Sequence, residues 1–337
     1  MKTNKPLSLL IAGMLSISMT ATATAAELNQ RKEVKNFIAD MHKRHGFETA
    51  KLDNLFAKTN TQESIIKAIT RPAEKKDWHQ YRPIFLGQSR IDGGVKFWEK
   101  HAKTLQRATE KYGVDSAVIV GIIGVETRYG RHAGNYKVID ALSTLAFDYP
   151  PRSKFFRKEL EHYLLMTREE KVDPLALRGS YAGAMGQPQF ISSSYRSYAI
   201  DFNNDGKRDI WESTEDAIGS VANYLSRHGW QRGRPITQKL NTSDVSQSGI
   251  LKEKALKPSH TVASLKQKGF GNITQDVNDA EKAAVINLIN KDNTESWLGL
   301  KNFYVITRYN HSALYAMAVF QLSEEIKAAR QLALKGK

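Results

Sequence analysis

The sequence predicts a mainly α-helical protein of the α+β class, with one small β-containing insert. Apolar residues recur at helical spacing through most of the chain, as in 34–41, where they share one face. Residues 118–125 form an almost wholly apolar run, which is typical of a buried helix. After Trp230 the chain becomes polar, and short apolar clusters such as 284–289 indicate strands. The 337 residues, with 41% hydrophobic content, suffice for more than one domain.

In the first part of the chain the helical spacing is interrupted once. Arg71-Pro72 breaks the pattern, so we expect 78–91 to be extended or looped. Asp115 is placed to cap the N-terminus of the buried helix, and Gly130 follows its end as a stop signal. The helices expected in this part are 34–41, 52–56, 65–69 and 97–108.

The rest of the chain alternates helices with irregular segments. Tyr149-Pro150-Pro151 forms a rigid turn, and the Gly- and Ser-rich segment 179–194 cannot pack as a regular element. Lys291-Asp292-Asn293 indicates a turn between two extended segments of the insert. The helices expected here are 139–147, 155–166, 216–228 and 312–334.

The N-terminus has the features of a secretory signal peptide. Residues 1–26 combine Lys2 and Lys5, a short apolar stretch and a run of small residues that ends at Ala26. The apolar stretch is short and contains several serines, which makes a membrane anchor the weaker interpretation. We therefore expect an exported, periplasmic protein without stable membrane insertion.

The composition narrows the chemistry and the partners. The sequence contains no cysteine, which excludes disulfides, thiolate metal sites and cysteine nucleophiles. The formal net charge is +15, and the basic residues are scattered rather than gathered in a nucleic-acid-binding motif. Such a charge on an exported protein suits an anionic polymer outside the cytoplasm and argues against nucleic acid as a partner.

Glu126 closes the apolar run 118–125. Burial penalises the charged form of a carboxylate, so we expect the pKa of Glu126 to be raised. A carboxylic acid that stays protonated near neutral pH is the general acid that cleavage of a glycosidic bond requires. The alternative is a helix-terminal glutamate that faces solvent or pairs with Arg128 or Arg131.

A segment rich in glycine and alanine, 179–190, leaves its backbone accessible to close approach by another chain. Within it, Ser180 and Gln189 carry polar groups that can orient a carboxyl or bind a sugar amide. The alternative is a helix contact made by small residues.

The stretch 201–212 matches the pattern of a calcium-binding EF-hand loop in full. Oxygen-bearing side chains occupy loop positions 1, 3 and 5, and Gly206 occupies the sharp turn at position 6. The predicted ligands of a structural calcium ion are Asp201, Asn203, Asp205, the carbonyl of Lys207, and either Glu212 or Asp216. The alternative is an Asp- and Asn-rich turn that binds no metal.

Together these motifs resemble the membrane-bound lytic murein transglycosylase B type of peptidoglycan lytic transglycosylases. The matching segments follow the expected order over about residues 80–320. They are Gly124-Val-Glu126-Thr-Arg-Tyr-Gly130, 140–145, 179–190, Ser193-Ser-Tyr195, the loop that begins at Asp201, 216–224, 228–230 and 307–312.

The resemblance implies a lysozyme-like helical core with an EF-hand-type loop, an additional helical domain built from both ends of the chain, and a small β domain. The expected domains are 1–26 (signal peptide), 27–100 (N-terminal helical domain, joined by the C-terminal helix 312–337), 101–231 (lysozyme-like catalytic core with the calcium loop 201–216), 232–300 (small β-containing domain) and 301–337 (return to the core and C-terminal helix). Calcium is the expected structural cofactor.

The resemblance also implies an activity, which is non-hydrolytic cleavage of the β-1,4 bond between N-acetylmuramic acid and N-acetylglucosamine. Its product is a 1,6-anhydromuramoyl end. By the same resemblance, Glu126 falls at the single catalytic acid and base, and Ser180 at the serine that hydrogen-bonds it. The residues that fall at glycan-contacting positions are Tyr81, Arg152, Gln189, Tyr224, Tyr309 and Asn310.

The chain departs from the family pattern in two ways. It has no cysteine after the expected signal peptide to carry a lipid, and Gln187-Pro188 replaces the Tyr-Gly of some members. The expected partners are peptidoglycan glycan strands and cell-wall synthases or other wall enzymes, with the protein itself a monomer. The competing functions are a hydrolytic muramidase and a non-catalytic, calcium-dependent wall-binding protein.

Overall fold

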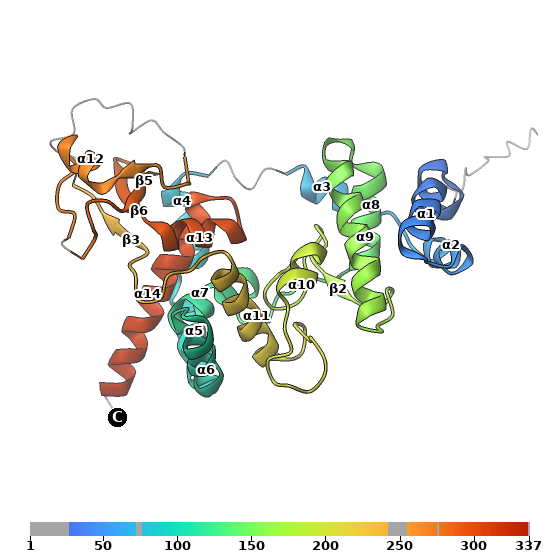
Figure 1. Ribbon diagram of the computed structural model, residues 1–337, viewed down its shortest axis with the longest axis horizontal. Coiled ribbons are helices and arrows are strands. Elements are labelled where there is room, and N and C mark those ends of the chain that lie inside the picture. Colours follow the sequence, from blue (N-terminus) through green and yellow to red (C-terminus); the bar gives the residue numbers. More distant parts are fainter. Residues whose placement is uncertain (1–26, 72–75, 242–254, 275, 336–337) are drawn as a thin grey trace, which may run out of the picture.

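The computed structural model describes residues 27–71, 76–241, 255–274 and 276–335, and the expected signal peptide lies outside them. Helices dominate these residues, and a small antiparallel sheet lies toward one end of the elongated molecule (Figure 1). The mainly α-helical class predicted from the sequence is therefore confirmed. Within the described ranges, no helix is long and apolar enough to cross a membrane.

The first helices of the chain pack against two helices from its middle, at the end of the molecule opposite the sheet (Figure 1). The rings of Phe37, Phe56 and Phe147 meet edge to face, with centroids 6.0 to 6.5 Å apart. Arg44 forms an ion pair with Glu161 at 2.7 Å. The helices joined in this way are η1 Leu28–Gln30, α1 Lys32–His45, α2 Thr49–Ala57, α3 Glu63–Ile69, α8 Val138–Asp148 and α9 Ser153–Glu169.

The segment 78–91, expected to be extended or looped, is helical, so that prediction was wrong. The helices of this region are α4 Trp78–Phe85, α5 Gln88–Lys100 and α6 Ala102–Tyr112. Trp78 and Ile91 are buried in the main core. Burial of this apolar face stabilises α4, a helix that is short and contains Pro83 and would be weak by itself.

The central helix, α7 Ser116–Thr127, is buried along nearly its whole length. Asp115 caps its N-terminus as predicted, because the carboxylate accepts the N–H of Ala117 at 2.8 Å. A side chain added at Gly121 would lie 3.0 Å from the backbone oxygen of Val319 on α14 Ala313–Lys335. Glycine at this position therefore permits the close packing of α14 on α7.

The C-terminal helix α14 packs against α7 and α5, and also against α13 Lys301–Tyr309 and α4. The region 27–100 is thus divided, since α1 to α3 lie on α8 and α9 whereas α4 and α5 lie beside α14. The proposed domain boundaries stay a prediction, but these contacts show that both ends of the chain contribute to the body around α7.

The segment 179–190 forms a compact loop held by short antiparallel pairings. β2 Arg178–Gly179 pairs with β1 Tyr136–Lys137. Met185 forms isolated bridges with Gly179 and with Phe190, and both Met185 and Phe190 are buried. The loop therefore has a fixed shape, and it is followed by α10 Ser192–Tyr198 and α11 Thr214–Arg227.

The insert after Trp230 contains an antiparallel sheet with the strand order β3-β6-β5-β4. β5 and β6 form a hairpin that turns at Lys291-Asp292-Asn293, which confirms the predicted turn. Phe270, Val285 and Leu298 belong to a second apolar core of this insert. Its elements are β3 Thr237–Lys239, β4 His260–Thr261, α12 Val262–Gln267, β5 Lys282–Ile289 and β6 Thr294–Gly299, with α13 Lys301–Tyr309 following.

Candidate active site

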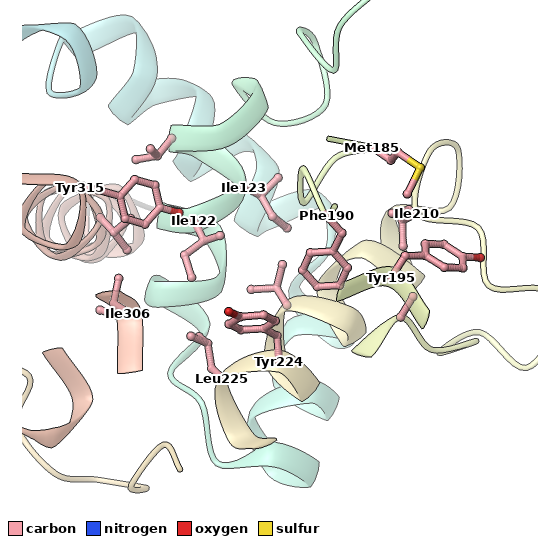
Figure 2. Packing of buried hydrophobic residues seen from close by; sticks show 14 of the residues in the cluster. Ile122, Ile123, Met185, Phe190, Tyr195, Ile210, Tyr224, Leu225, Ile306 and Tyr315 are labelled. Carbon is pink, nitrogen blue, oxygen red and sulfur yellow. The ribbon is translucent and has the colours of Figure 1, made fainter. Parts of the chain in front are cut away.

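Glu126 lies in the last turn of α7, beside α14, after the buried run 118–125. Tyr315 of α14 lies next to α7 (Figure 2), and its hydroxyl donates a hydrogen bond to Oε1 of Glu126 at 2.6 Å. Burial raises the pKa of Glu126 from its usual 4.5 to about 7, while the bond from Tyr315 favours the charged form and lowers the pKa. The predicted raised pKa is confirmed, and near neutral pH a large fraction of the carboxyl is protonated.

Arg128 and Arg131 do not pair with Glu126. Within the described part of the chain, neither arginine comes within ion-pair distance of a carboxylate. The backbone reverses directly after α7, because Arg128 and Tyr129 both adopt left-handed φ values of 50° and 64°. The hydroxyl of Tyr129 fixes this reversal by donating to the carbonyl of Arg90 at 2.7 Å. The alternative that Glu126 pairs with Arg128 or Arg131 is therefore wrong for the described residues, and Glu126 is half-buried rather than exposed.

A cluster of tyrosines adjoins Glu126, in which Tyr224 and Tyr315 are buried and Tyr309 is partly buried. The rings of Tyr309 and Tyr315 are nearly parallel, with centroids 6.4 Å apart and an interplanar angle of 10°. The ring centroid of Tyr224 lies 4.7 Å from that of Tyr309, and Figure 2 shows Tyr224 beside Phe190. Burial, and next the charge of Glu126, raise the pKa of Tyr309 and Tyr315 well above the usual range. Both phenols therefore stay protonated and can act as hydrogen-bond donors.

Two of these phenols are already committed to backbone carbonyls. Tyr309 donates to the carbonyl of Pro188 at 2.7 Å, and Tyr224 donates to the carbonyl of Arg308 at 2.5 Å. The bond from Tyr309 joins the end of α13 to the 179–190 loop. Tyr224 is 7% exposed, so its part in any glycan contact is limited to the small exposed portion of its ring.

Ser180 does not hydrogen-bond Glu126 in this structure. Its Oγ instead accepts the N–H groups of Ala182 at 3.3 Å and Ala184 at 3.1 Å. These two bonds, together with the left-handed Gly183, hold the tight turn at the start of the loop. The Ser180 hydroxyl uses two acceptor positions in this way and keeps its single O–H for donation.

The other predicted glycan-contacting residues occupy different surroundings. Gln189 has a left-handed φ of 51°, and its Nε2 donates to the carbonyls of Ala133 and Gly186 at 3.0 and 2.9 Å. Asn310 is exposed at the end of α13. The structure thus places Gln189 on the loop that Tyr309 also contacts.

Tyr81 and Arg152 complete the predicted set. Tyr81 is partly buried on α4, and it is the last of the groups whose electrostatic interaction raises the pKa of Tyr315, after burial, Glu126 and Tyr309. Arg152 is exposed in the short helix η2 Pro150–Arg152, where its guanidinium lies over the ring of Phe155 at 4.3 Å. The structure therefore brings Tyr81 toward the tyrosine cluster, whereas the contacts of Arg152 are with its own neighbours in the chain.

Tyr315 is the site residue that sequence reasoning missed. It lies 189 positions after Glu126 and carries no local pattern of its own. The one available signal was its place three residues after Ser312, which ends a segment already matched to the family pattern.

The loop 201–212 folds around its own carboxylates. Asp201 accepts the N–H of Asp205 at 3.1 Å and of Gly206 at 2.8 Å. The side-chain amide nitrogen of Asn203 donates to Asp205 at 3.0 Å, and its amide oxygen accepts the backbone N–H of Asp205 at 3.1 Å. These oxygen donors are those that calcium prefers. In the described ranges, however, no group of three or more acidic or histidine residues is arranged to hold a metal ion.

Asp216 fastens the loop to α11. It is fully buried, and its two oxygens accept the N–H groups of Phe202, Asn203 and Asp209 at 2.7 to 3.2 Å. Glu212, the alternative ligand, is exposed. Oδ1 of Asp216 accepts two of these N–H groups and Oδ2 accepts one, so only Oδ2 can accept or coordinate one further partner. Asp216 therefore cannot bind a calcium ion through two free oxygens.

Comparison with known proteins identifies the family. The model of the transglycosylase SLT domain matches residues 29–324. The membrane-bound lytic murein transglycosylase B of Escherichia coli K12 is 39% identical over 306 residues, covering 88% of this chain and 83% of that protein.

Comparison with solved structures leads to the same family. The soluble lytic transglycosylase SltB1 of Pseudomonas aeruginosa is 48% identical, with a TM-score of 0.83 over 89% of this chain and 99% of that chain. The Escherichia coli lytic transglycosylase Slt35 in complex with calcium is 40% identical, with a TM-score of 0.80 over 88% of this chain and 93% of that chain. These likenesses confirm the predicted lysozyme-like fold of lytic transglycosylases. This chain belongs to the transglycosylase SLT-domain family, and it is a peptidoglycan lytic transglycosylase.

Proposed function

We propose that this enzyme cleaves the β-1,4 bond between N-acetylmuramic acid and N-acetylglucosamine without water and leaves a 1,6-anhydromuramoyl end. The observation that carries the proposal is the carboxyl of Glu126, which lies half-buried at the end of α7 and whose pKa is raised by burial to about 7. Such a group can donate a proton near neutral pH and accept one back.

A single carboxylate performs both steps in this scheme. Neutral Glu126 donates its proton to the leaving glycosidic oxygen as the bond from that oxygen to C1 breaks. The N-acetyl carbonyl of the substrate stabilises the positive charge at C1, which is a known exception to the two-carboxylate rule. The carboxylate of Glu126 then takes the proton of the C6 hydroxyl, whose oxygen bonds to C1 and closes the anhydro ring. The internal hydroxyl is favoured over water because it is already tethered to the reacting sugar.

The use of two other acids of the core supports a one-carboxylate mechanism. Asp140 accepts hydrogen bonds from the backbone of Asn60 at 3.0 Å and the amide of Gln62 at 3.2 Å. Asp148 pairs with Arg31 at 2.7 Å. Both carboxylates attach the N-terminal helices to α8. Among the residues that the structure describes, burial and the bond from Tyr315 shift the pKa of Glu126 and no acidic residue does, which fits an active site without a second carboxylate nucleophile.

Ser180 and Tyr315 have complementary parts in this scheme. Tyr315 already donates to Glu126 and would orient the carboxyl throughout. Ser180 would direct its free O–H toward the carboxylate that forms after the first proton transfer. Tyr81, Arg152, Gln189, Tyr224, Tyr309 and Asn310 would contact the glycan on both sides of the scissile bond.

The loop 201–216 would hold a structural calcium ion. Asp201, Asn203, Asp205 and the carbonyl of Lys207 would supply its ligands, and Asp216 would add one bond while retaining the loop on α11. The chemistry of this donor set suits calcium, because every ligand is an oxygen. When bound, the ion would stabilise the fold beside the 179–190 loop.

The mature enzyme would act in the periplasm as a monomer. Its basic surface would favour approach to the anionic wall, and cell-wall synthases or other wall enzymes are the protein partners to test.

Mass spectrometry of the products after digestion of purified peptidoglycan tests the proposed reaction. Anhydro ends lack the elements of one water relative to reducing ends, and we expect anhydro ends alone. Reducing ends would support a hydrolytic muramidase instead, and absence of any product would support a wall-binding protein.

A further inference from the structure

A small basic pocket lies beside the turn 128–132, where the backbone reverses after α7. Its volume is about 160 Å³, and it is enclosed between the end of α4, the start of α5 and the turn after Glu126. Three arginines and a histidine line it, and none of the described acidic side chains does. The lining residues that carry or shape the pocket are Arg90, Arg128, Arg131, His132, Ile84 and Gly93. We call it the arginine pocket.

The arginine pocket adjoins the active site. Arg128 stands two positions after Glu126, and α4 contributes Ile84 to the pocket and Tyr81 to the tyrosine cluster near Tyr315. The same short helix therefore borders both places. Arg90 also donates to the carbonyl of Gly124, so the pocket lies next to the last turn of α7, which carries Glu126.

The backbone is strained where it turns Arg128 toward the pocket. Arg128 and Tyr129 are consecutive non-glycine residues with left-handed φ, a conformation that costs about 1 kcal/mol or more for each. Tyr129 keeps this turn in place through the bond to the carbonyl of Arg90 and through contact with Gly93 and Gly124. The strain is maintained by surrounding structure, as is common at binding sites.

The positive charges of the pocket are not neutralised within the described part of the protein. Arg90 is half-buried, and it donates to the carbonyls of Gly124 and Ile84 but to no carboxylate. Burial, and next the charge of Arg128, lower the pKa of Arg90. Arg128 and Arg131 have exposed side chains without an ion pair in the described ranges. Charges gathered in this way are suited to an anion.

We propose that the arginine pocket binds a carboxylate of the peptide carried by the glycan next to the scissile bond. The inference rests on the proposed function, because it requires a peptidoglycan strand in the active site. Guanidinium groups bind carboxylates through paired, charge-assisted hydrogen bonds. The pocket is large enough for the carboxyl end of one amino acid and too small for a disaccharide. The enzyme would therefore recognise the peptide as well as the sugar chain.

The test compares two substrates and three proteins. The substrates are glycan strands with their peptides and strands stripped of peptides by an amidase. Arg128→Asn/Arg131→Gln removes two charges, and asparagine tolerates the left-handed conformation at position 128. Lys43→Gln/Lys96→Gln removes two exposed charges elsewhere and controls for general attraction to the wall.

We expect kcat/KM of the double arginine variant to fall about tenfold on peptide-bearing strands, as for loss of a charge-assisted bond, and less than about twofold on stripped strands. The lysine variant should change equally little on both. An equal loss on both substrates, or no loss on either, would overturn the inference. Failure of the wild type to cleave either substrate would instead refute the proposed function.

A second measurement needs no variant protein. Amidation of the peptide carboxylates removes the charge from the substrate side of the contact. The wild type should then lose the same factor in kcat/KM, and the arginine variant should lose little more. If the wild type cleaves amidated and native strands equally well, no carboxylate occupies the pocket.

Discussion

Glu126→Gln measures the energetic cost of holding an ionisable group at the end of α7. Glutamine has nearly the same shape and still accepts the hydrogen bond from Tyr315, but it does not ionise. A pKa raised from 4.5 to about 7 corresponds to about 3 kcal/mol, at 1.36 kcal/mol per unit. We therefore expect the variant to lose glycan cleavage and to gain stability in alkaline solution.

The sign follows from proton linkage. The folded protein binds the proton of Glu126 more tightly than the unfolded chain does, so the free energy of unfolding of the wild type falls as pH rises from 4.5 to about 7. The variant lacks this dependence. The two proteins should be equally stable in acid below this window, and the variant should be more stable by up to about 3 kcal/mol above it.

Urea denaturation over a pH series from about 4 to about 9 gives the free energy of unfolding of both proteins. Glu325→Gln, at an exposed position of α14, controls for the loss of one carboxylate from the surface. A constant difference between Glu126→Gln and wild type across the series would show that the carboxyl is not buried. Lysis of purified sacculi at the wild-type rate would show that Glu126 is not the catalytic acid.

Three further changes test separate parts of the structure. Tyr315→Phe removes the donor to Glu126 and should raise the pKa of that carboxyl further, because the lost hydrogen bond favours the charged form. The basic limb of kcat/KM against pH should move to higher pH, and an unmoved limb would contradict the bond. Asp201→Ala should lower the melting temperature in calorimetry and abolish the response to a calcium chelator; identical wild-type curves with and without chelator would remove the calcium site. Asp115→Ala should lower the free energy of unfolding by about 1 kcal/mol in urea denaturation, through loss of the helix cap, while activity per folded molecule stays the same.

Features encoded by neighbouring residues could be predicted from the sequence. The cap at Asp115 and the hairpin turn at 291–293 depend on hydrogen bonds and turn preferences within a few residues. The raised pKa of Glu126 followed from the apolar run before it, because a run of that kind is buried wherever the helix is placed. The motifs of the 179–190 loop and the 201–212 loop likewise lie within short segments.

Other features depend on segments far apart in the chain. The sequence does not predict the helical state of 78–91, because Pro72 and Pro83 argue against a helix there. The apolar face of this segment stabilises a helix only because α14 and the core cover it in the folded protein. In the same way, nothing near Ser180 shows that its hydroxyl binds the backbone of its own turn rather than the catalytic carboxyl.

The family, the helical class and the identity of the acid at the end of α7 could be predicted from the sequence, because each depends on local composition and spacing. The group that holds this acid could be found only in the folded protein, since Tyr315 reaches Glu126 across 189 positions through the packing of α14 on α7. Only the fold likewise gathers Arg90, from α5, with Arg128 and Arg131 in one pocket. The physical reason is the same in both cases: a hydrogen bond or a charge cluster between distant residues exists only after burial has brought their helices together.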